Sequence, residues 1–416
     1  MGEKKMNKCQ RWSLNLRLFY IMFVFMYGIV VKFTIVNDFL FAIKTIIPEI
    51  TLLAIAGLAI LVHGFGMRPY YFVLFSYSLF VFSMNLATHG LTEQGQYALR
   101  DMYIPVVAFS FMMIPFPEEK INTYTRRSTL FLKFYLIAGL LLAFIEQIKG
   151  WQWSSAFYTG YEFYGQDPVS KIKIAHNFGL LRAPSLSGNF ATFGYYCLIA
   201  AVAVNAYTKS RKEKVFWNLI ALSCMVLATN KSAVVVFMVI LILRCTVNLR
   251  QRSARINNLI VFMIAGFVGI STLLLWLESS ETKGVFLSLY QRVEYWIEIL
   301  SDGSVVELIF PYNQFLYGSG AKGGVSFWDN TYLYSLFTQG IIGTILWIYA
   351  IYASYKRRMK DQDSSKRQMV YELTIALIVL SLTANVTQGR GFLAPYLVLL
   401  CTGLSSESST QIPRKA

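Results

Sequence analysis

Long apolar runs, separated by short polar segments, recur along the whole chain. Repeated runs of roughly 17 to 25 residues have the length that a helix needs to cross the hydrocarbon core of a bilayer, and about twelve spans are plausible. The runs are continuous, whereas the strands of a transmembrane barrel alternate apolar and polar residues. The pattern therefore predicts an all-α polytopic membrane protein, with residues 1–416 forming one integral membrane domain. The expected spans are 18–36, 46–63, 69–87, 98–115, 130–148, 189–207, 216–230, 232–248, 258–277, 330–353, 370–386 and 391–405.

Two long polar breaks interrupt this pattern, at about 151–188 and 278–329. The other connections between apolar runs are short. No repeat of fixed period is visible, and the two halves of the chain do not resemble each other. We expect the spans to form a bundle that holds these two loops over the same patch of membrane.

Composition supports this interpretation. With 56% hydrophobic and only 14% charged residues, the chain has more apolar surface than a soluble core can bury. In a soluble protein the net charge of +16 would favour binding to nucleic acid. Membrane proteins, however, concentrate Lys and Arg on their cytoplasmic side. We therefore expect no nucleic-acid partner.

The distribution of the 38 Lys and Arg residues predicts the orientation. Most of them fall in the N-terminal tail and in alternate connections, which include KSRKEK (209–214) and YKRRMK (355–360). The positive-inside rule then places both termini in the cytoplasm and both long loops outside. The first apolar run is too long for the core of a cleaved signal peptide, so we interpret it as a retained span.

The five cysteines predict neither disulfides nor a metal site. Cys197, Cys224, Cys245 and Cys401 fall in apolar spans, and Cys9 lies in the basic N-terminal tail. None lies in a long loop, and no cluster of metal-ligating residues is visible. We expect no metal and no cofactor.

Several ionisable residues fall at the outer ends of the expected spans. Such groups can extend to the lipid headgroups, or they can line a polar cavity open to the outside. Both explanations remain open for any one of them. Together with the two outer loops they favour a cavity, in which Arg100 and Arg390 would contact substrate. The set is Glu49, Arg100, Asp101, Glu146, Lys231 and Arg390.

Arg182 stands out in the first loop. Pro184 and Gly188 follow it and keep the chain out of a helix just before the sixth span. A guanidinium group there would grip a phosphate with two hydrogen bonds, and it does not lose its proton. The alternative is an anchor in the lipid headgroups. The Trp and Tyr residues of this loop fit either an interfacial aromatic belt or a platform for sugar rings.

The second loop contains a short amphipathic segment. Arg292 and Trp296 are four residues apart and so share one helical face, while Glu294 and Glu298 share another. Asp329 then stands at the start of the tenth span, where a helix N-terminus favours an anion. Its simpler interpretation is a helix cap.

Several short motifs, in this order, are the basis of a resemblance. They are LLRAPSLSGNFATFGYY (180–196), LATNKSAVVVF (227–237), LYQRVEYW (289–296), GSG (318–320) and WDNTYLYSLFTQGIIGTILW (328–347). Over about 180–350 the chain resembles the O-antigen polymerase and ligase superfamily, which comprises Wzy-type polysaccharide polymerases and the lipopolysaccharide O-antigen ligases. Each motif is short, and it is their order and spacing within the predicted topology that is characteristic.

The resemblance implies a GT-C-like helical bundle in the inner membrane of a bacterium, and a glycosyltransferase reaction. The donor would be an oligosaccharide linked to undecaprenyl pyrophosphate, and the acceptor a sugar hydroxyl. Outer-loop arginines of the family are thought to bind the donor pyrophosphate. That role would fall on Arg182 and Arg292, with Lys231 as a third cation. A flippase and a chain-length regulator would be further partners.

The resemblance gives a less specific indication of the residues that bind the acceptor sugar. Asp329 would accept or orient the proton of the acceptor hydroxyl, with Glu294 and Glu298 as rivals. Asn330 would contact the substrate beside it. Ligases typically carry a histidine directly before this asparagine, and this chain has Asp329 there. The departure favours a polymerase, which makes O-antigen, capsule or exopolysaccharide, over a ligase that transfers glycan to lipid A-core.

A third hypothesis is a membrane transporter with about twelve spans. Transporters often show an internal repeat and carry polar sites near the middle of the bilayer. Neither feature is visible here, and the polar sequence is concentrated in two outer loops. The sequence therefore favours the enzyme.

Overall fold

The computed structural model describes part of the chain and shows it to be helical, apart from one pair of two-residue strands. The described residues are 8–34, 38–63, 69–90, 99, 104, 116, 118–157, 176–177, 179–246, 294, 296–297, 301, 305–311, 330–359, 363–384, 386 and 392–402.

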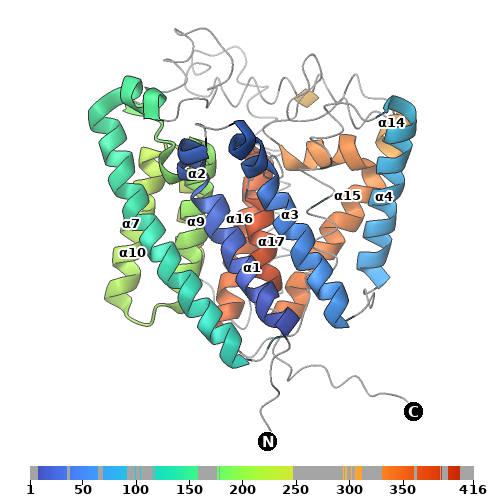
Figure 1. The fold of residues 1–416 in the computed structure, drawn as a ribbon, viewed down its shortest axis with the longest axis horizontal. Helices are drawn as coiled ribbons and strands as arrows, with labels where there is room; N and C mark the ends of the chain where they lie inside the picture. Colours follow the sequence, from blue (N-terminus) through green and yellow to red (C-terminus); the bar gives the residue numbers. More distant parts are fainter. Residues whose placement is uncertain are drawn as a thin grey trace, which may run out of the picture.

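The long helices run side by side in a bundle (Figure 1). The elements are α1 (Lys8–Phe25), α2 (Tyr27–Thr34), α3 (Asp38–His63), α4 (Pro69–His89), α7 (Glu118–Phe157), β1 (His176–Asn177), β2 (Leu180–Leu181), the 3-10 turn η2 (Ser185–Ser187), α9 (Phe190–Tyr207), α10 (Arg211–Leu227), α11 (Lys231–Thr246), α14 (Val305–Ile309), α15 (Thr331–Arg358), α16 (Ser364–Thr383) and α17 (Leu393–Thr402).

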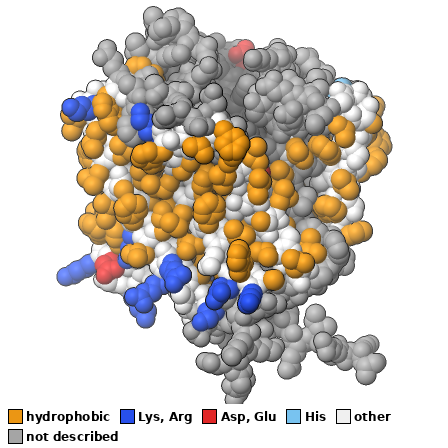
Figure 2. Space-filling view, viewed as in Figure 1, with side chains coloured by type: hydrophobic (Ala, Val, Ile, Leu, Met, Phe, Trp, Pro, Cys, Tyr) orange, Lys and Arg blue, Asp and Glu red, His pale blue; other side chains and the backbone are white. Residues whose placement is uncertain are grey.

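The chain is an all-α membrane protein. Within the described residues, four helices are long and apolar enough to cross a bilayer, and α1 with α2 make a fifth if the bent pair is one span. The four stretches are Tyr71–His89, Lys120–Trp151, Phe190–Tyr207 and Thr331–Arg358. On the face shown in Figure 2, exposed apolar side chains form a broad belt, and Lys and Arg side chains gather along its lower rim. Such a belt suits contact with lipid.

The predicted spans are confirmed as helices wherever the structure describes them. The span 258–277 lies outside the described residues, as does 98–115 apart from Leu99 and Ile104. The count of about twelve spans therefore stays a prediction.

Helix α9 lies at the centre of the bundle. It packs against α7, α10, α11 and α16, and 83% of its span is buried inside the protein. A helix that is apolar all round is expected to be buried in this way. It begins with Asn189, whose side-chain oxygen accepts hydrogen bonds from the N–H groups of Ala191 (2.9 Å) and Thr192 (3.2 Å). This cap fixes where the preceding irregular segment enters the bundle.

The first predicted span, 18–36, is not one straight helix. Helices α1 and α2 meet at an angle of 75°. At this break the Ser187 hydroxyl donates a hydrogen bond to the carbonyl of Phe25 (3.3 Å), which is the last residue of α1. Gly28 of α2 lies directly against the backbone of Gly188. The segment that precedes α9 therefore occupies the place where a straight helix would continue.

Helix α15 is also broken, at Gly340, whose φ of 68° and ψ of 178° are not helical. The part before Gly340 runs across the bundle near its upper end, and the part after it descends (Figure 1). The break frees the carbonyl of Gln339, and the Tyr77 hydroxyl of α4 donates a hydrogen bond to it (2.9 Å). A Cβ on Gly340 would meet the carbonyl of Leu308 in α14 at 2.9 Å. Glycine is needed here both for the positive φ and for the close approach.

Candidate functional site

The segment 180–189, which begins with β2 and leads into α9, is folded into the protein. Leu181 is 3% exposed, and Ala183 and Ser185 are fully buried. A buried backbone without helical hydrogen bonds must find other partners, because an unsatisfied N–H or C=O group is costly away from water. The partners of this segment come from α7 and α10.

Gln147 of α7 pairs with Leu181 as a neighbouring strand would. Its side-chain N–H group donates to the Leu181 carbonyl (2.6 Å), and its side-chain oxygen accepts from the Leu181 N–H (3.0 Å). Two residues later, the N–H of Ala183 donates to the carbonyl of Leu227, the last residue of α10 (3.1 Å). The backbone on both sides of Arg182 is thereby fixed.

Glu146, the neighbour of Gln147, is fully buried. Its two carboxylate oxygens accept the N–H of Ser185 at 3.1 and 3.2 Å. The Ser185 hydroxyl donates in turn to the carbonyl of Gly139 (2.8 Å). The sequence made Glu146 a candidate for the lining of a polar cavity open to the outside. In the structure its carboxylate instead binds backbone inside the protein.

Arg182 itself is half-buried, and its guanidinium carbon lies 4.3 Å from the centre of the Phe190 ring. This is a cation–π contact, which places the guanidinium group over the ring of the first residue of α9. A guanidinium group held against a ring keeps its N–H donors in its own plane, which is the plane in which a phosphate binds with two hydrogen bonds.

Lys231 is exposed and is the first residue of α11. The turn before it is rigid, because Asn230 donates to the carbonyl of Ala191 (2.9 Å) and accepts the N–H of Ala233 (3.0 Å). Since this turn follows α10, whose last carbonyl binds Ala183, the structure brings Arg182 and Lys231 to the same end of the bundle.

The other predicted site residues fall mostly outside the described part of the chain. These are Arg100, Arg292, Glu298, Asp329 and Arg390. Glu294 is helical and exposed, and Trp296 beside it is buried, as expected for an amphipathic segment.

Asn330 caps helix α15. It is 3% exposed, and its side-chain oxygen accepts the N–H groups of Tyr332 (3.0 Å) and Leu333 (3.1 Å). Thr331 joins this start to the end of α16, because its hydroxyl donates to the carbonyl of Ala384 (2.8 Å) and accepts the N–H of Val386 (2.9 Å). The start of α15 at Asn330 and Thr331 is thus well fixed.

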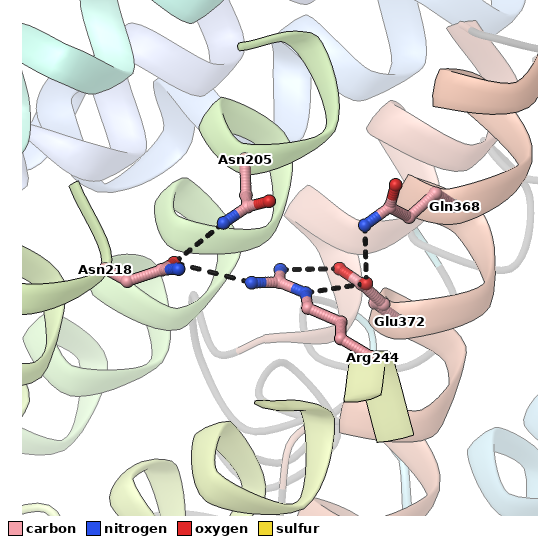
Figure 3. Close-up of polar contacts among 5 residues, drawn as sticks. All are labelled: Asn205, Asn218, Arg244, Gln368 and Glu372. Atoms are coloured by element: carbon pink, nitrogen blue, oxygen red, sulfur yellow. Dashed lines mark hydrogen bonds and ion pairs between the residues drawn. The ribbon is translucent and has the colours of Figure 1, made fainter. Parts of the chain in front are cut away.

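A second polar cluster lies inside the bundle where α11 ends and α16 begins (Figure 3). The Arg244 guanidinium makes two hydrogen bonds to the Glu372 carboxylate (2.8 and 2.7 Å) and one to Asn218 (3.4 Å). Asn205 donates to Asn218 (2.9 Å), and Gln368 donates to Glu372 (2.9 Å). The cluster connects α9, α10, α11 and α16, and its charged groups bond to each other, which is typical of a structural role.

Sequence reasoning missed Gln147, Thr331 and Asn230. Each is polar and lies in or beside an apolar run, and Gln147 directly follows Glu146, which the sequence did single out. A pair of adjacent polar residues within a span is therefore the feature that would have identified the site.

Among the residues that the structure describes, no three His, Cys, Asp or Glu side chains come together to hold a metal ion. No known family model, no curated protein and no solved structure matches this chain.

Proposed function

We propose that the chain is a polysaccharide polymerase of the Wzy kind. It transfers an oligosaccharide from an undecaprenyl-pyrophosphate donor to the terminal sugar hydroxyl of a second lipid-linked repeat unit. The observation that carries the proposal is the setting of Arg182, which lies on a segment held by hydrogen bonds to α7 and α10, with its guanidinium over the Phe190 ring. The reaction itself is proposed from the resemblance of the short motifs to those of the O-antigen polymerase and ligase superfamily.

The chemistry fits a fixed cation. In the transfer, the bond between the anomeric carbon and the phosphate oxygen breaks, and a bond to the acceptor oxygen forms. Negative charge then develops on the leaving pyrophosphate, and a preorganised donor beside that charge contributes on the order of 3 kcal/mol. Arg182 serves this role, with Arg292 and Lys231 as the other cations. The acceptor proton passes to a carboxylate, for which Asp329 is the candidate.

The proposed topology has about twelve spans, with both termini in the cytoplasm of a bacterial cell and both long loops outside. It is supported by the lower rim of the apolar belt, where Lys and Arg gather at the end at which α1 begins (Figure 2). Helix α10 begins and α15 ends at this same end (Figure 1), and α15 ends in Lys356, Arg357 and Arg358. The segment around Arg182 belongs to the opposite end, where a lipid-linked donor would lie after its transfer across the membrane.

The test is complementation of a deletion strain of the host. Arg182→Ala should leave the protein in the membrane in normal amount but abolish long polysaccharide chains, and Arg182→Lys should restore little, because lysine lacks the planar donor set. Lys149→Ala, an exposed change near the same end of α7, is the matched control and should make chains of normal length.

Normal chains from both Arg182 variants would refute the role of this residue. The deletion strain itself separates the two reactions of the superfamily. If the deleted protein is a polymerase, the strain should carry single repeat units on the acceptor. If it is a ligase, the strain should instead accumulate free lipid-linked polymer. Solute transport by the purified protein, with no transfer between lipid-linked repeats, would favour a transporter.

A further inference from the structure

Two adjacent polar residues, Glu146 and Gln147, lie near the upper end of α7, directly after the apolar run 134–145. Burying a carboxylate and an amide within a membrane protein is costly unless their hydrogen bonds are made. Leucine at either position would pack without this penalty. The presence of both polar groups therefore needs an explanation in what they bind.

Both groups bind backbone on either side of one residue. The Gln147 side chain donates to the carbonyl of Leu181 and accepts its N–H, and the Glu146 carboxylate accepts the N–H of Ser185. Arg182 follows Leu181 directly. Successive residues of a helix point in directions about 100° apart, so the pair reaches two points of the segment that a single side chain would not reach together.

The remaining attachments complete the support. Ala183 is bound to the end of α10, and Ser185 and Ser187 donate to carbonyls of α7 and α1. The Tyr135 hydroxyl of α7 lies 2.7 Å from the Ser187 hydroxyl. Helix α7 thus holds the segment at three places, and Arg182 lies between two of them. The backbone is therefore held on both sides of Arg182.

We propose that Glu146 and Gln147 are positioning residues, which hold the backbone around Arg182 so that its guanidinium meets the pyrophosphate of the donor. The inference rests on the proposed function for the identity of the ligand. The positioning itself is a property of the fold, and it is tested without any substrate.

The first measurement is the mobility of residue 182. Arg182→Cys is made in a full-length chain whose native cysteines are replaced by alanine, and a nitroxide label attached there is followed by electron paramagnetic resonance in lipid nanodiscs. Gln147→Ala and Glu146→Ala should each increase the mobility of the label. Glu146→Gln keeps an acceptor for the Ser185 N–H and should leave the spectrum nearly unchanged, as should the control Lys149→Ala.

The second measurement is transfer kinetics with Arg182 in place. The probe is the lipid-linked repeat unit extracted from the deletion strain, and chain elongation is followed by gel electrophoresis. Gln147→Ala should lower kcat by about 10- to 100-fold, because a small displacement of a catalytic group has effects of that size, and should change KM much less. In a protein that already carries Arg182→Lys, Gln147→Ala should lower kcat by a smaller factor than it does in the wild-type protein.

The outcomes separate the two proposals. Unchanged label mobility in both Gln147→Ala and Glu146→Ala overturns the positioning role, whatever the kinetics. The positioning role is also overturned if the fold-losses in kcat from Gln147→Ala and Arg182→Lys simply multiply in the double variant. If mobility increases but Arg182→Ala still makes normal polymer, the proposed function fails while the positioning of residue 182 stands.

Discussion

Gly28 shows how closely the first helix pair approaches the segment before α9. A Cβ placed on Gly28 would lie 2.3 Å from the backbone nitrogen of Gly188 and 2.6 Å from its Cα. Both contacts are to backbone, which cannot rotate away as a side chain can. Gly188 itself has a φ of 72°, so it too is held in a conformation that suits glycine.

Gly28→Ala should therefore destabilise the protein. Overpacking against backbone costs about 1–3 kcal/mol, and the unfolding temperature in detergent micelles, followed by intrinsic fluorescence, measures it. Gly57→Ala is the matched control, because nothing lies within 4 Å of the Cβ position at Gly57 in α3. There alanine should be neutral or stabilise by up to about 1 kcal/mol. Equal unfolding temperatures for the two variants would contradict the close contact.

At the residue scale the sequence identifies Arg182 but not Gly28. Arg182 is recognisable because Pro184 and Gly188 follow it and predict a non-helical segment before an apolar run. The importance of Gly28 is invisible in the sequence, because it depends on a residue 160 positions away (188 − 28) that only the folded chain brings near.

At the element scale, hydropathy locates helices well and their breaks poorly. An apolar window averages over residues, so 18–36 reads as one span although the chain turns by 75° after Phe25. The turn is imposed by tertiary contacts with Ser187 and Gly188. Similarly, Gly340 in α15 looks like one more glycine in an apolar run, and its non-helical backbone and close contact with α14 become visible only in the fold.

The buried cluster around Arg244 connects four helices and allows a test of what holds them together. The side chains of Arg244 and Glu372 are 14% and 2% exposed. Glu372→Gln leaves the arginine without its buried anion and should destabilise the protein by about 3–5 kcal/mol. Replacing both Arg244 and Glu372 with methionine should recover most of that loss, since no buried charge then remains. Chemical unfolding in mild detergent measures both effects.

The control for this experiment is a second ion pair in the same bundle. Lys133 and Glu213 lie 3.8 Å apart, and the Glu213 side chain is 59% exposed. An exposed pair of this kind contributes about 0–1 kcal/mol, so Glu213→Gln should have little effect. If Glu372→Gln is as mild as this control, the cluster around Arg244 does not hold the helices together.

At the scale of the whole molecule, the sequence predicts an all-α membrane protein, and the structure confirms that much. The sequence does not predict which segments contact each other in the fold. The pairing of α7 with the segment before α9 follows from Gln147, Glu146 and Ser185, polar residues whose partners a linear pattern does not specify. The positive-inside rule depends only on counting charges in connections, so orientation is the whole-molecule property that the sequence does predict.

That orientation has a direct test in single cysteines introduced at exposed lysines. Lys149 and Lys231 belong to the end that carries Arg182, whereas Lys212 lies in the first turn of α10 and Lys356 in the last turn of α15, at the basic rim. In spheroplasts, Lys149→Cys and Lys231→Cys should react with a membrane-impermeant maleimide. Lys212→Cys and Lys356→Cys should react only after the membrane is opened with detergent, which also serves as the control for intrinsic reactivity. The reverse pattern would place Arg182 in the cytoplasm, on the wrong side for a donor that polymerases use outside, and would refute the proposed function together with the topology.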